Sequence, residues 1–172
     1  MSSIELATPR LLLREFAAGD VDDLHAMDGD ARVMRFLANG LAARTRDECA
    51  AALRRMDERY RGQPGYGLLH ARTRDDGRFV GGCGLFALPD SGEVEIAYRL
   101  PVACWGRGYA TEMARAVLAH GFDTLRLSRI IGLTWPENIA SQRVLEHIGL
   151  RRTGTGRYYE REMLVFAATA AA

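Results

Sequence analysis

Two glycines between a predicted strand and a predicted helix form the motif with the clearest chemical meaning. They are Gly106 and Gly108, in the stretch Trp-Gly-Arg-Gly-Tyr-Ala-Thr-Glu over residues 105–112. Glycine lets the backbone approach a ligand closely, because it has no side chain. The start of a helix also leaves N–H groups unpaired and carries the positive end of the helix dipole. The motif therefore predicts an anion site, most often one for phosphate.

The elements on either side of this motif must position it. Residues 94–100 alternate between apolar and polar side chains, which predicts a strand with Glu95 on its polar face. Apolar residues at helical spacing predict a helix over residues 110–122, and β-branched residues predict a strand over residues 129–134. A strand, a helix and a strand in this order form a right-handed crossover, so the two strands should pair in parallel.

The remaining segments predict an α+β fold. Asp20 should cap a first helix, and Thr45 with Glu48 forms a capping box for a second helix that ends at Gly62. Further strands are expected over residues 10–16, 66–72, 79–86 and 158–166, with a hairpin turn at residues 75–77. We therefore expect helices around a mixed sheet, in a single domain spanning residues 1–172.

Composition excludes several classes of protein. The 172 residues are 48% hydrophobic, which suits one domain with a full core, and the net charge of +1 argues against a nucleic-acid partner. No run approaches the roughly 20 apolar residues of a membrane span, and no signal core is present, so a cytoplasmic protein is expected. Cys49, Cys83 and Cys104 form no CxxC motif, which argues against a disulfide framework or a zinc site, and no metal is expected.

Three segments, in this order and spacing, make the chain similar to the GNAT superfamily of N-acetyltransferases. They are residues 95–98 (Glu-Ile-Ala-Tyr), residues 105–112, and residues 138–150, which begin Asn-Ile-Ala-Ser. The ribosomal-protein-alanine, or Rim-type, branch is the most similar, since residues 8–14 also resemble its start. The resemblance covers roughly residues 8–167. It implies a mixed, mostly antiparallel central sheet with a parallel, splayed pair of strands, flanked by helices.

The resemblance implies that acetyl-CoA is the co-substrate and that its acetyl group moves to a primary amine by direct attack on the thioester. The loop of Trp105, Gly106, Arg107, Gly108, Tyr109, Ala110 and Thr111 would wrap the CoA pyrophosphate, with backbone N–H groups of Arg107, Gly108, Ala110 and Thr111 as donors. Family members usually have Gln or Arg where this chain has Trp105, so Trp105 is expected to pack against the cofactor or the core. The Arg107 side chain would reach a CoA phosphate or lie in solvent.

The pantetheine arm would enter the gap between the splayed strands. Asn138 fits a contact to the pantetheine, and it also fits the N-cap of the helix that follows. Backbone N–H groups near Tyr98 to Leu100 would meet the developing oxyanion.

Two side chains are candidates for the chemistry that the resemblance implies. A free α-amine has a pKa of ~8 and a lysine amine ~10.4, so the attacking amine must lose a proton. Glu95 matches the family's general base, acting through water, although a solvated position on the polar strand face is the alternative. Ser141 is the nearest hydroxyl to the leaving thiolate, although it also fits helix capping. The tyrosine that many family members carry seven residues after the asparagine is Leu145 here.

The acceptor is expected to be a protein N-terminus or a small-molecule amine, and the protein a monomer or a homodimer. The alternative function is a non-catalytic acyl-CoA-binding module that senses or regulates. Release of thiol in the presence of amines distinguishes the two.

Overall fold

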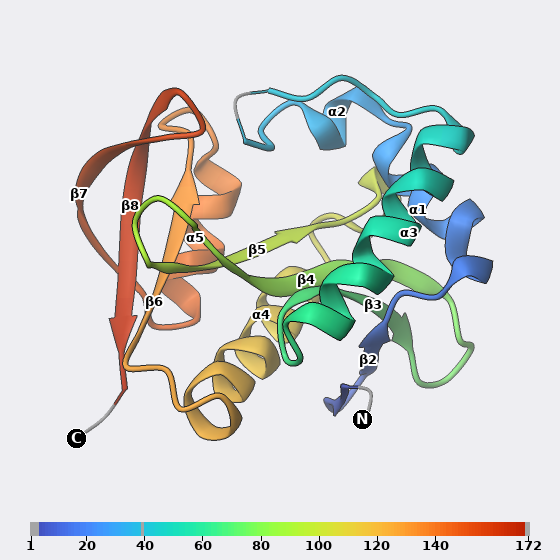
Figure 1. Ribbon diagram of the computed structural model, residues 1–172, viewed down its shortest axis with the longest axis horizontal. Coiled ribbons are helices and arrows are strands. Elements are labelled where there is room, and N and C mark those ends of the chain that lie inside the picture. The colour runs from blue at the N-terminus through green and yellow to red at the C-terminus, as the bar shows by residue number, and fades with distance from the viewer. Residues whose placement is uncertain (1–3, 39, 171–172) are drawn as a thin grey trace.

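The computed structural model describes residues 4–38 and 40–170, whose strands form one mixed sheet (Figure 1). The strands in chain order are β1 (Glu5–Ala7), β2 (Leu11–Glu15), β3 (Gly67–Thr73), β4 (Phe79–Ala87), β5 (Val94–Arg99), β6 (Arg129–Thr134), β7 (Arg151–Tyr158) and β8 (Arg161–Thr169). Their order across the sheet is β1-β2-β3-β4-β5-β6-β8-β7. Among these strands, β5 and β6 pair in parallel and the other neighbours pair antiparallel. The predicted mixed α+β fold is confirmed.

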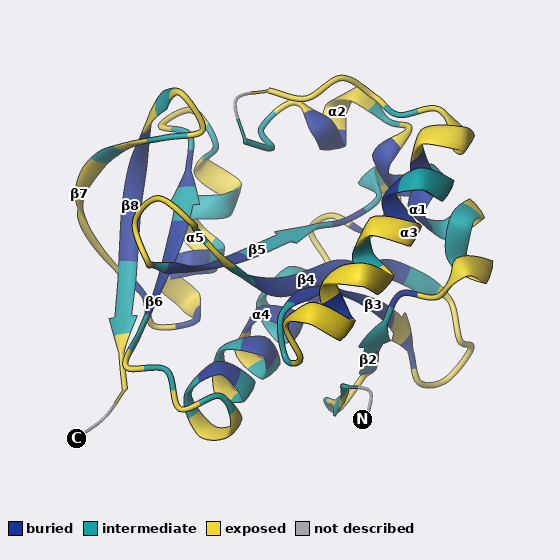
Figure 2. Cartoon of the chain, viewed as in Figure 1, coloured by how far each residue is buried: buried dark blue, intermediate teal, exposed yellow. Residues whose placement is uncertain are grey.

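Helices cover both faces of the sheet. They are α1 (Val21–Asp28), α2 (Ala31–Met34), α3 (Arg46–Gly62), α4 (Tyr109–Ala119) and α5 (Ile139–His147), with 3-10 turns at Ala18–Asp20 and Val102–Cys104 and a π turn at His120–Thr124. Leu68 packs with α1 and α3, whereas its neighbour Leu69 packs with α4, because successive strand residues face opposite sides. Figure 2 shows the result: buried central strands, and helices exposed on their outer sides.

The parallel pair is splayed. The register of β5 and β6 consists of one pair, Glu95 with Ile131, whereas β4 pairs with β5 over six residue pairs. Past Glu95 the two strands separate, so the β6-facing edge of β5 is left without a neighbouring strand. This is the gap that the family resemblance implies.

The prediction of one final strand over residues 158–166 is wrong, because the chain forms two strands there and neither has these bounds. Two strands, β7 and β8, meet at a two-residue turn formed by Tyr159 and Glu160. Both turn residues have positive φ angles, 51° and 61°, as a type I′ turn requires. Such turns normally carry Asn and Gly, so residues 159–160 contain no turn signal. Strand β7 is a mostly exposed edge strand without an apolar alternation, which is why it was missed.

Local chemistry explains where the helices start. Thr45 and Glu48 form the predicted capping box of α3. Asp20 precedes α1, but it does not cap the helix as predicted. Its carboxylate instead accepts hydrogen bonds from the Ala17 N–H and from both terminal nitrogens of Arg14, so it closes the turn before the helix.

A buried ion cluster holds the site strand β5 against α1. Asp28 at the end of α1 is fully buried, and it accepts hydrogen bonds from Arg99 at the end of β5 (Nε 2.7 Å, Nη2 3.0 Å) and from Arg44 (Nη1 2.8 Å). Carboxylate and guanidinium groups leave water at a large desolvation cost, which only good mutual geometry offsets. The cluster therefore fixes how the first helices sit over β5.

Replacing Asp28 with asparagine should lower the free energy of unfolding by about 3–5 kcal/mol, because it leaves two guanidinium groups without their shared buried anion. Urea denaturation measures the loss. Asp30→Asn is the matched control, since Asp30 makes an exposed pair with Arg32 and asparagine caps helices equally well. Equal unfolding midpoints for wild type and Asp28→Asn would contradict this role for the cluster.

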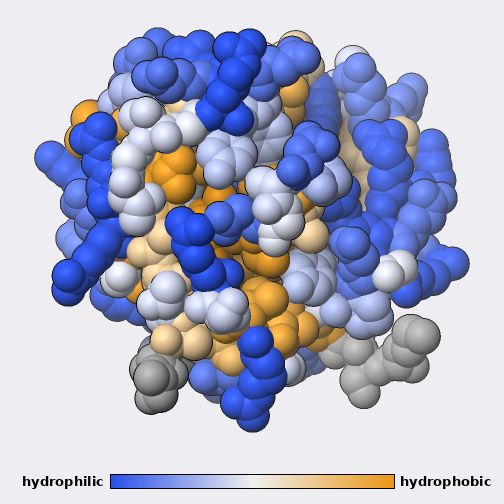
Figure 3. All heavy atoms as spheres, turned by 60° about the vertical axis from the view of Figure 1, so that its left-hand side comes forward, coloured by the Kyte–Doolittle hydropathy of each residue, from blue (hydrophilic) through white to orange (hydrophobic). Residues whose placement is uncertain are grey.

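Three further observations complete the description. Cys49, Cys83 and Cys104 are free thiols, and all three are buried. Within residues 4–38 and 40–170, no helix combines the length and the apolar character that crossing a membrane needs. Figure 3 turns the left-hand side of Figure 1 forward and shows hydrophobic side chains exposed among hydrophilic ones near the centre of that face.

Candidate active site

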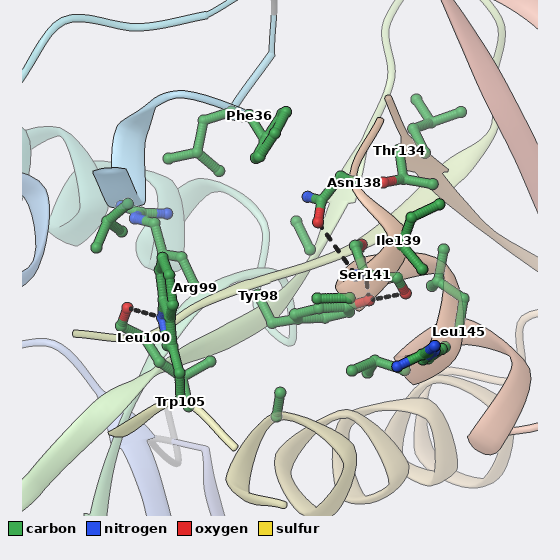
Figure 4. A pocket seen from close by; sticks show the side chains of 18 of the residues that line it. Phe36, Tyr98, Arg99, Leu100, Trp105, Thr134, Asn138, Ile139, Ser141 and Leu145 are labelled. Atoms are coloured by element: carbon green, nitrogen blue, oxygen red, sulfur yellow. Dashed lines mark hydrogen bonds between the residues drawn. The ribbon is translucent and has the colours of Figure 1, made fainter. Parts of the chain in front are cut away.

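A cavity of about 660 Å³ opens where β5 and β6 separate (Figure 4). Its lining comes from β5, the glycine loop, the starts of α4 and α5, the end of β6, the α2 region and the β7–β8 turn. The predicted site residues that line it are Glu95, Tyr98, Leu100, Trp105, Gly106, Gly108, Tyr109, Ala110, Thr111, Asn138 and Ser141. Elements far apart in the sequence thus contribute to one cavity.

The glycine loop lies at one end of this cavity. Gly106 and Gly108 have φ angles of 72° and 77°, and Gly108 is the residue from which α4 begins. Only glycine adopts these angles at low cost. The first N–H groups of α4 have no partners within the helix, so the loop presents donors and the positive dipole end at the cavity.

The structure shows where two side chains of the loop lie, Trp105 and Arg107, for which the sequence allowed two positions each. Trp105 is 50% exposed, and its indole N–H donates to the Leu100 carbonyl at 2.9 Å, so the ring is fixed at the cavity rim and does not enter the core. The Arg107 side chain is exposed and is not part of the cavity lining.

An N-terminal segment holds the loop in place, a role that the sequence did not reveal. Glu112, in the first turn of α4, accepts hydrogen bonds from the Thr8 hydroxyl (2.6 Å) and from the Arg10 backbone N–H (2.9 Å) and Nε (2.6 Å). Arg10 also donates to the Arg107 carbonyl at 3.1 Å. Residues 8–10 and Glu112 are more than 100 positions apart in the sequence, so no local sequence pattern predicts that they meet.

Glu95 lies beside the point where β5 and β6 separate. Glu95 is only 6% exposed, so the alternative that it occupies a solvated position on the strand is wrong. The strand alternation is correct, but helices and the β7–β8 turn cover this polar face. Burial raises the pKa of Glu95 to about 7, while a hydrogen bond from the Tyr159 hydroxyl (2.5 Å) lowers it. A carboxyl group with this pKa can exchange a proton near neutral pH.

Replacing Tyr159 with phenylalanine should move the pKa of Glu95 further upward, because the change removes the hydrogen bond that favours the carboxylate. Any activity that needs ionised Glu95 should then start at higher pH than in wild type. A pH–rate profile measures the shift. Tyr158→Phe is the matched control, because Tyr158, the last residue of β7, directly precedes Tyr159 in the chain and does not line the cavity. An unchanged profile for Tyr159→Phe would count against this pairing.

Hydroxyl and amide groups gather on the other side of the split strands. The Asn138 side chain accepts a hydrogen bond from the Ser141 N–H at 3.2 Å, so its helix N-cap role is confirmed. The Tyr98 hydroxyl donates to the Ser141 carbonyl at 3.0 Å and lies 3.0 Å from the Ser141 Oγ atom. Figure 4 shows Tyr98 pointing across the gap toward the start of α5.

Thr134 at the end of β6 is a cavity residue that the sequence reasoning missed. It is 1% exposed, and its hydroxyl has no hydrogen-bond partner among the described residues. Buried polar groups are normally paired, so this hydroxyl is suited to a ligand atom in the cavity. A threonine at a strand end is common, which explains why its type carried no signal.

Comparison with known proteins gives a consistent result. The family model of the acetyltransferase (GNAT) domain matches residues 10–151. An uncharacterized N-acetyltransferase of Bacillus subtilis, YnaD, is 30% identical over 151 residues, which are 88% of this chain and 85% of that protein.

Solved structures share the fold. An acetyltransferase from Agrobacterium tumefaciens superposes with a TM-score of 0.82 at 26% identity, covering 98% of this chain and 95% of that one. RimJ of Mycobacterium smegmatis, solved in complex with CoA-disulfide, superposes with a TM-score of 0.81, covering 98% of this chain and 87% of that one. At 21% identity, the likeness to RimJ concerns the fold alone.

Proposed function

Because this chain belongs to the GNAT family of acetyltransferases, we propose that its cavity transfers an acetyl group from acetyl-CoA to a primary amine. The observation that carries the proposal is the split between β5 and β6, which has a glycine-rich helix start at one end and the buried carboxyl group of Glu95 at the other. The first feature suits the phosphates of the co-substrate, and the second suits a proton acceptor for the amine.

The cofactor would lie along the gap. Backbone N–H groups between Gly106 and Thr111 would bind the pyrophosphate, and the pantetheine would add to the unpaired edge of β5 as an extra strand. Asn138 uses its side-chain oxygen for the helix cap, so its NH₂ group is the part that would donate to a pantetheine carbonyl. Trp105 and the Thr134 hydroxyl would contact the arm from the two walls.

Chemistry would take place beside Glu95. Its carboxylate, through a water molecule, takes a proton from the ammonium form of the acceptor. The amine nitrogen then attacks the thioester carbon and the new N–C bond forms. The nitrogen releases its second proton to water, and the C–S bond breaks with its electrons on sulfur. Backbone N–H groups near Tyr98 to Leu100 would stabilise the oxyanion. Ser141 lies on the sulfur side of the gap and would hydrogen-bond to the leaving group.

The acceptor remains a protein N-terminus or a small amine. The resemblance of residues 8–14 to the Rim-type branch favours a protein N-terminus, since RimL, which shares the fold, is named as an acetyltransferase of ribosomal protein L7/L12. The cavity also has an apolar side toward α2, where Val33, Phe36 and Leu37 line it. These side chains would pack against the group that carries the amine.

A thiol-release assay tests the proposal. The purified protein is mixed with acetyl-CoA and a panel of amines: peptides that begin with alanine, serine or methionine, free amino acids, spermidine and kanamycin. We expect release of CoA thiol with at least one of these classes, and mass spectrometry should find the acceptor 42 Da heavier, the mass of an added acetyl group. Binding of acetyl-CoA without thiol release by any amine would instead support the alternative of a non-catalytic acyl-CoA-binding module.

A further inference from the structure

Tyr98 and Glu95 lie on opposite faces of the same strand. Tyr98 lies three positions after Glu95, and side chains alternate along a strand, so Glu95 faces the first helices while Tyr98 faces α4 and α5. The glycine loop starts α4 and Asn138 starts α5, so the Tyr98 side belongs to the cofactor. A thioester that passes between β5 and β6 would have the carboxyl group on one side and the phenol on the other.

Hydrogen bonds fix the Tyr98 phenol at the start of α5. Its oxygen lies 3.0 Å from both the carbonyl oxygen and the Oγ atom of Ser141 (Figure 4). Tyr98 and Ser141 both line the cavity, and both residues are partly exposed. Their two hydroxyls therefore form a short hydrogen-bonded chain in the cavity wall that solvent can reach.

Helix α5 itself offers no proton donor one turn further on. Leu145 lies four residues after Ser141, on the same side of the helix, and it is 1% exposed. It packs so tightly on β6 that a Cβ atom added to Gly132 would lie 2.3 Å from its Cδ2 atom. The Tyr98 hydroxyl comes from β5 on the other side of the gap and is hydrogen-bonded to Ser141 at the start of α5.

The electrostatics suit an acid and not a base. Burial raises the pKa of the Tyr98 phenol above its usual range, against the hydrogen bond with Ser141, which lowers it. The phenol is therefore protonated throughout the neutral range. The same apolar surroundings disfavour a thiolate at this place, because burial penalises the charged form, and a departing sulfur there would readily accept a proton.

We propose that Tyr98 is the catalytic acid of this enzyme, donating its phenolic proton to the sulfur of CoA as the thioester breaks. This inference rests on the proposed function. In the step, the C–S bond breaks with its electron pair on sulfur, the O–H proton of Tyr98 moves to sulfur, and CoA leaves as the thiol. The phenolate regains a proton from solvent through the Ser141 hydroxyl. The ammonium form of the acceptor has given one proton to Glu95, and the nitrogen loses a second proton to water as the amide forms. This second proton balances the one that the phenolate regains, and Glu95 returns its proton to solvent before the next cycle.

Two variants test the proposal, with the fastest acceptor from the thiol-release panel. Tyr98→Phe should lower kcat by roughly 100-fold, at the lower end of the effect typical of general acid catalysis because a thiolate is a good leaving group, while the Kd for CoA changes less than about twofold. Tyr66→Phe is the matched control, because Tyr66 packs against the core outside the cavity, and it should keep wild-type kcat. A Tyr98→Phe kcat within about twofold of wild type, or a loss matched by weaker CoA binding, would overturn the assignment.

A second measurement separates proton donation from packing. Incorporation of 3,5-difluorotyrosine at position 98 keeps the ring and the hydroxyl but lowers the pKa of the phenol, because fluorine withdraws electrons. The variant should lose activity at high pH, as the phenol ionises there, in a range where wild type is still active. A profile without this new basic limb would contradict the role of Tyr98 as acid. If wild type itself releases no thiol with any amine, the proposed function fails, and that result is independent of the variants.

Discussion

Replacing Glu95 with glutamine is expected to lower kcat by about 10²–10³-fold, the effect typical of losing a general base. The amide keeps the shape of the side chain and can still accept the Tyr159 hydrogen bond, but it takes up no proton. Wild-type activity should fall as pH drops below about 7, where Glu95 becomes protonated. The Gln variant should lose this limb of the profile. A pH–rate series with wild type and variant measures both effects.

Glu93→Gln is the matched control for this experiment. Glu93 lies just before β5, and its carboxylate pairs with Arg129 at 2.6 Å outside the cavity. Its replacement should leave kcat and its pH dependence unchanged. If Glu95→Gln keeps wild-type kcat, or if both variants lose activity equally, Glu95 is not the base.

The same substitution has an expected effect on stability. The pKa of Glu95 is higher in the folded protein than its ordinary value of 4.5, so folding favours the protonated form. This contribution is fully present below pH 4.5 and is lost as pH rises through about 7, because ionised Glu95 is then buried. Glu95→Gln should therefore be more stable than wild type above pH 7, by up to roughly 3 kcal/mol. The buried carboxyl group that the reaction needs therefore lowers the stability of the folded protein.

Replacing Gly108 with tryptophan is expected to weaken acetyl-CoA binding by at least about 100-fold. The φ angle of 77° disfavours any side chain at this position, and an added Cβ would lie 3.4 Å from Arg10 Nη2. The bulky ring would also cover the N–H groups at the start of α4 that the phosphates need. Isothermal titration calorimetry with acetyl-CoA measures the loss.

Gly77→Trp controls for backbone strain in this experiment. Gly77 has a similar φ angle of 70° and open space around its Cβ position, but it lies in the β3–β4 turn outside the cavity. It should bind acetyl-CoA as wild type does, with a comparable loss of stability. Wild-type affinity in Gly108→Trp would show that the loop is not the phosphate site.

The sequence predicted the parts of the fold whose determinants are local. Hydrophobic alternation located β5, the Thr45 capping box located α3, and the strand–helix–strand order predicted the parallel pair. Strand β7 was missed because it is an exposed edge strand, and its turn uses Tyr159 and Glu160, which no turn rule favours.

The site could be predicted only in part, for a related reason. Residue types identified the glycine loop and Asn138, because helix-start chemistry is local. The burial of Glu95 depends on Tyr159, 64 residues away, and the Tyr98 hydroxyl meets Ser141 across 43 residues. Strand alternation alone placed Glu95 on a polar face, and only the tertiary structure covers that face.

The central claim is that acetyl-CoA lies in the gap between β5 and β6. Hydrogen–deuterium exchange of the wild-type protein, with and without saturating acetyl-CoA, tests it most directly. We expect slower exchange at residues 96–100, 105–112 and 133–141, and unchanged exchange along α3. Protection confined to other segments, or no change at saturating acetyl-CoA, would contradict the claim.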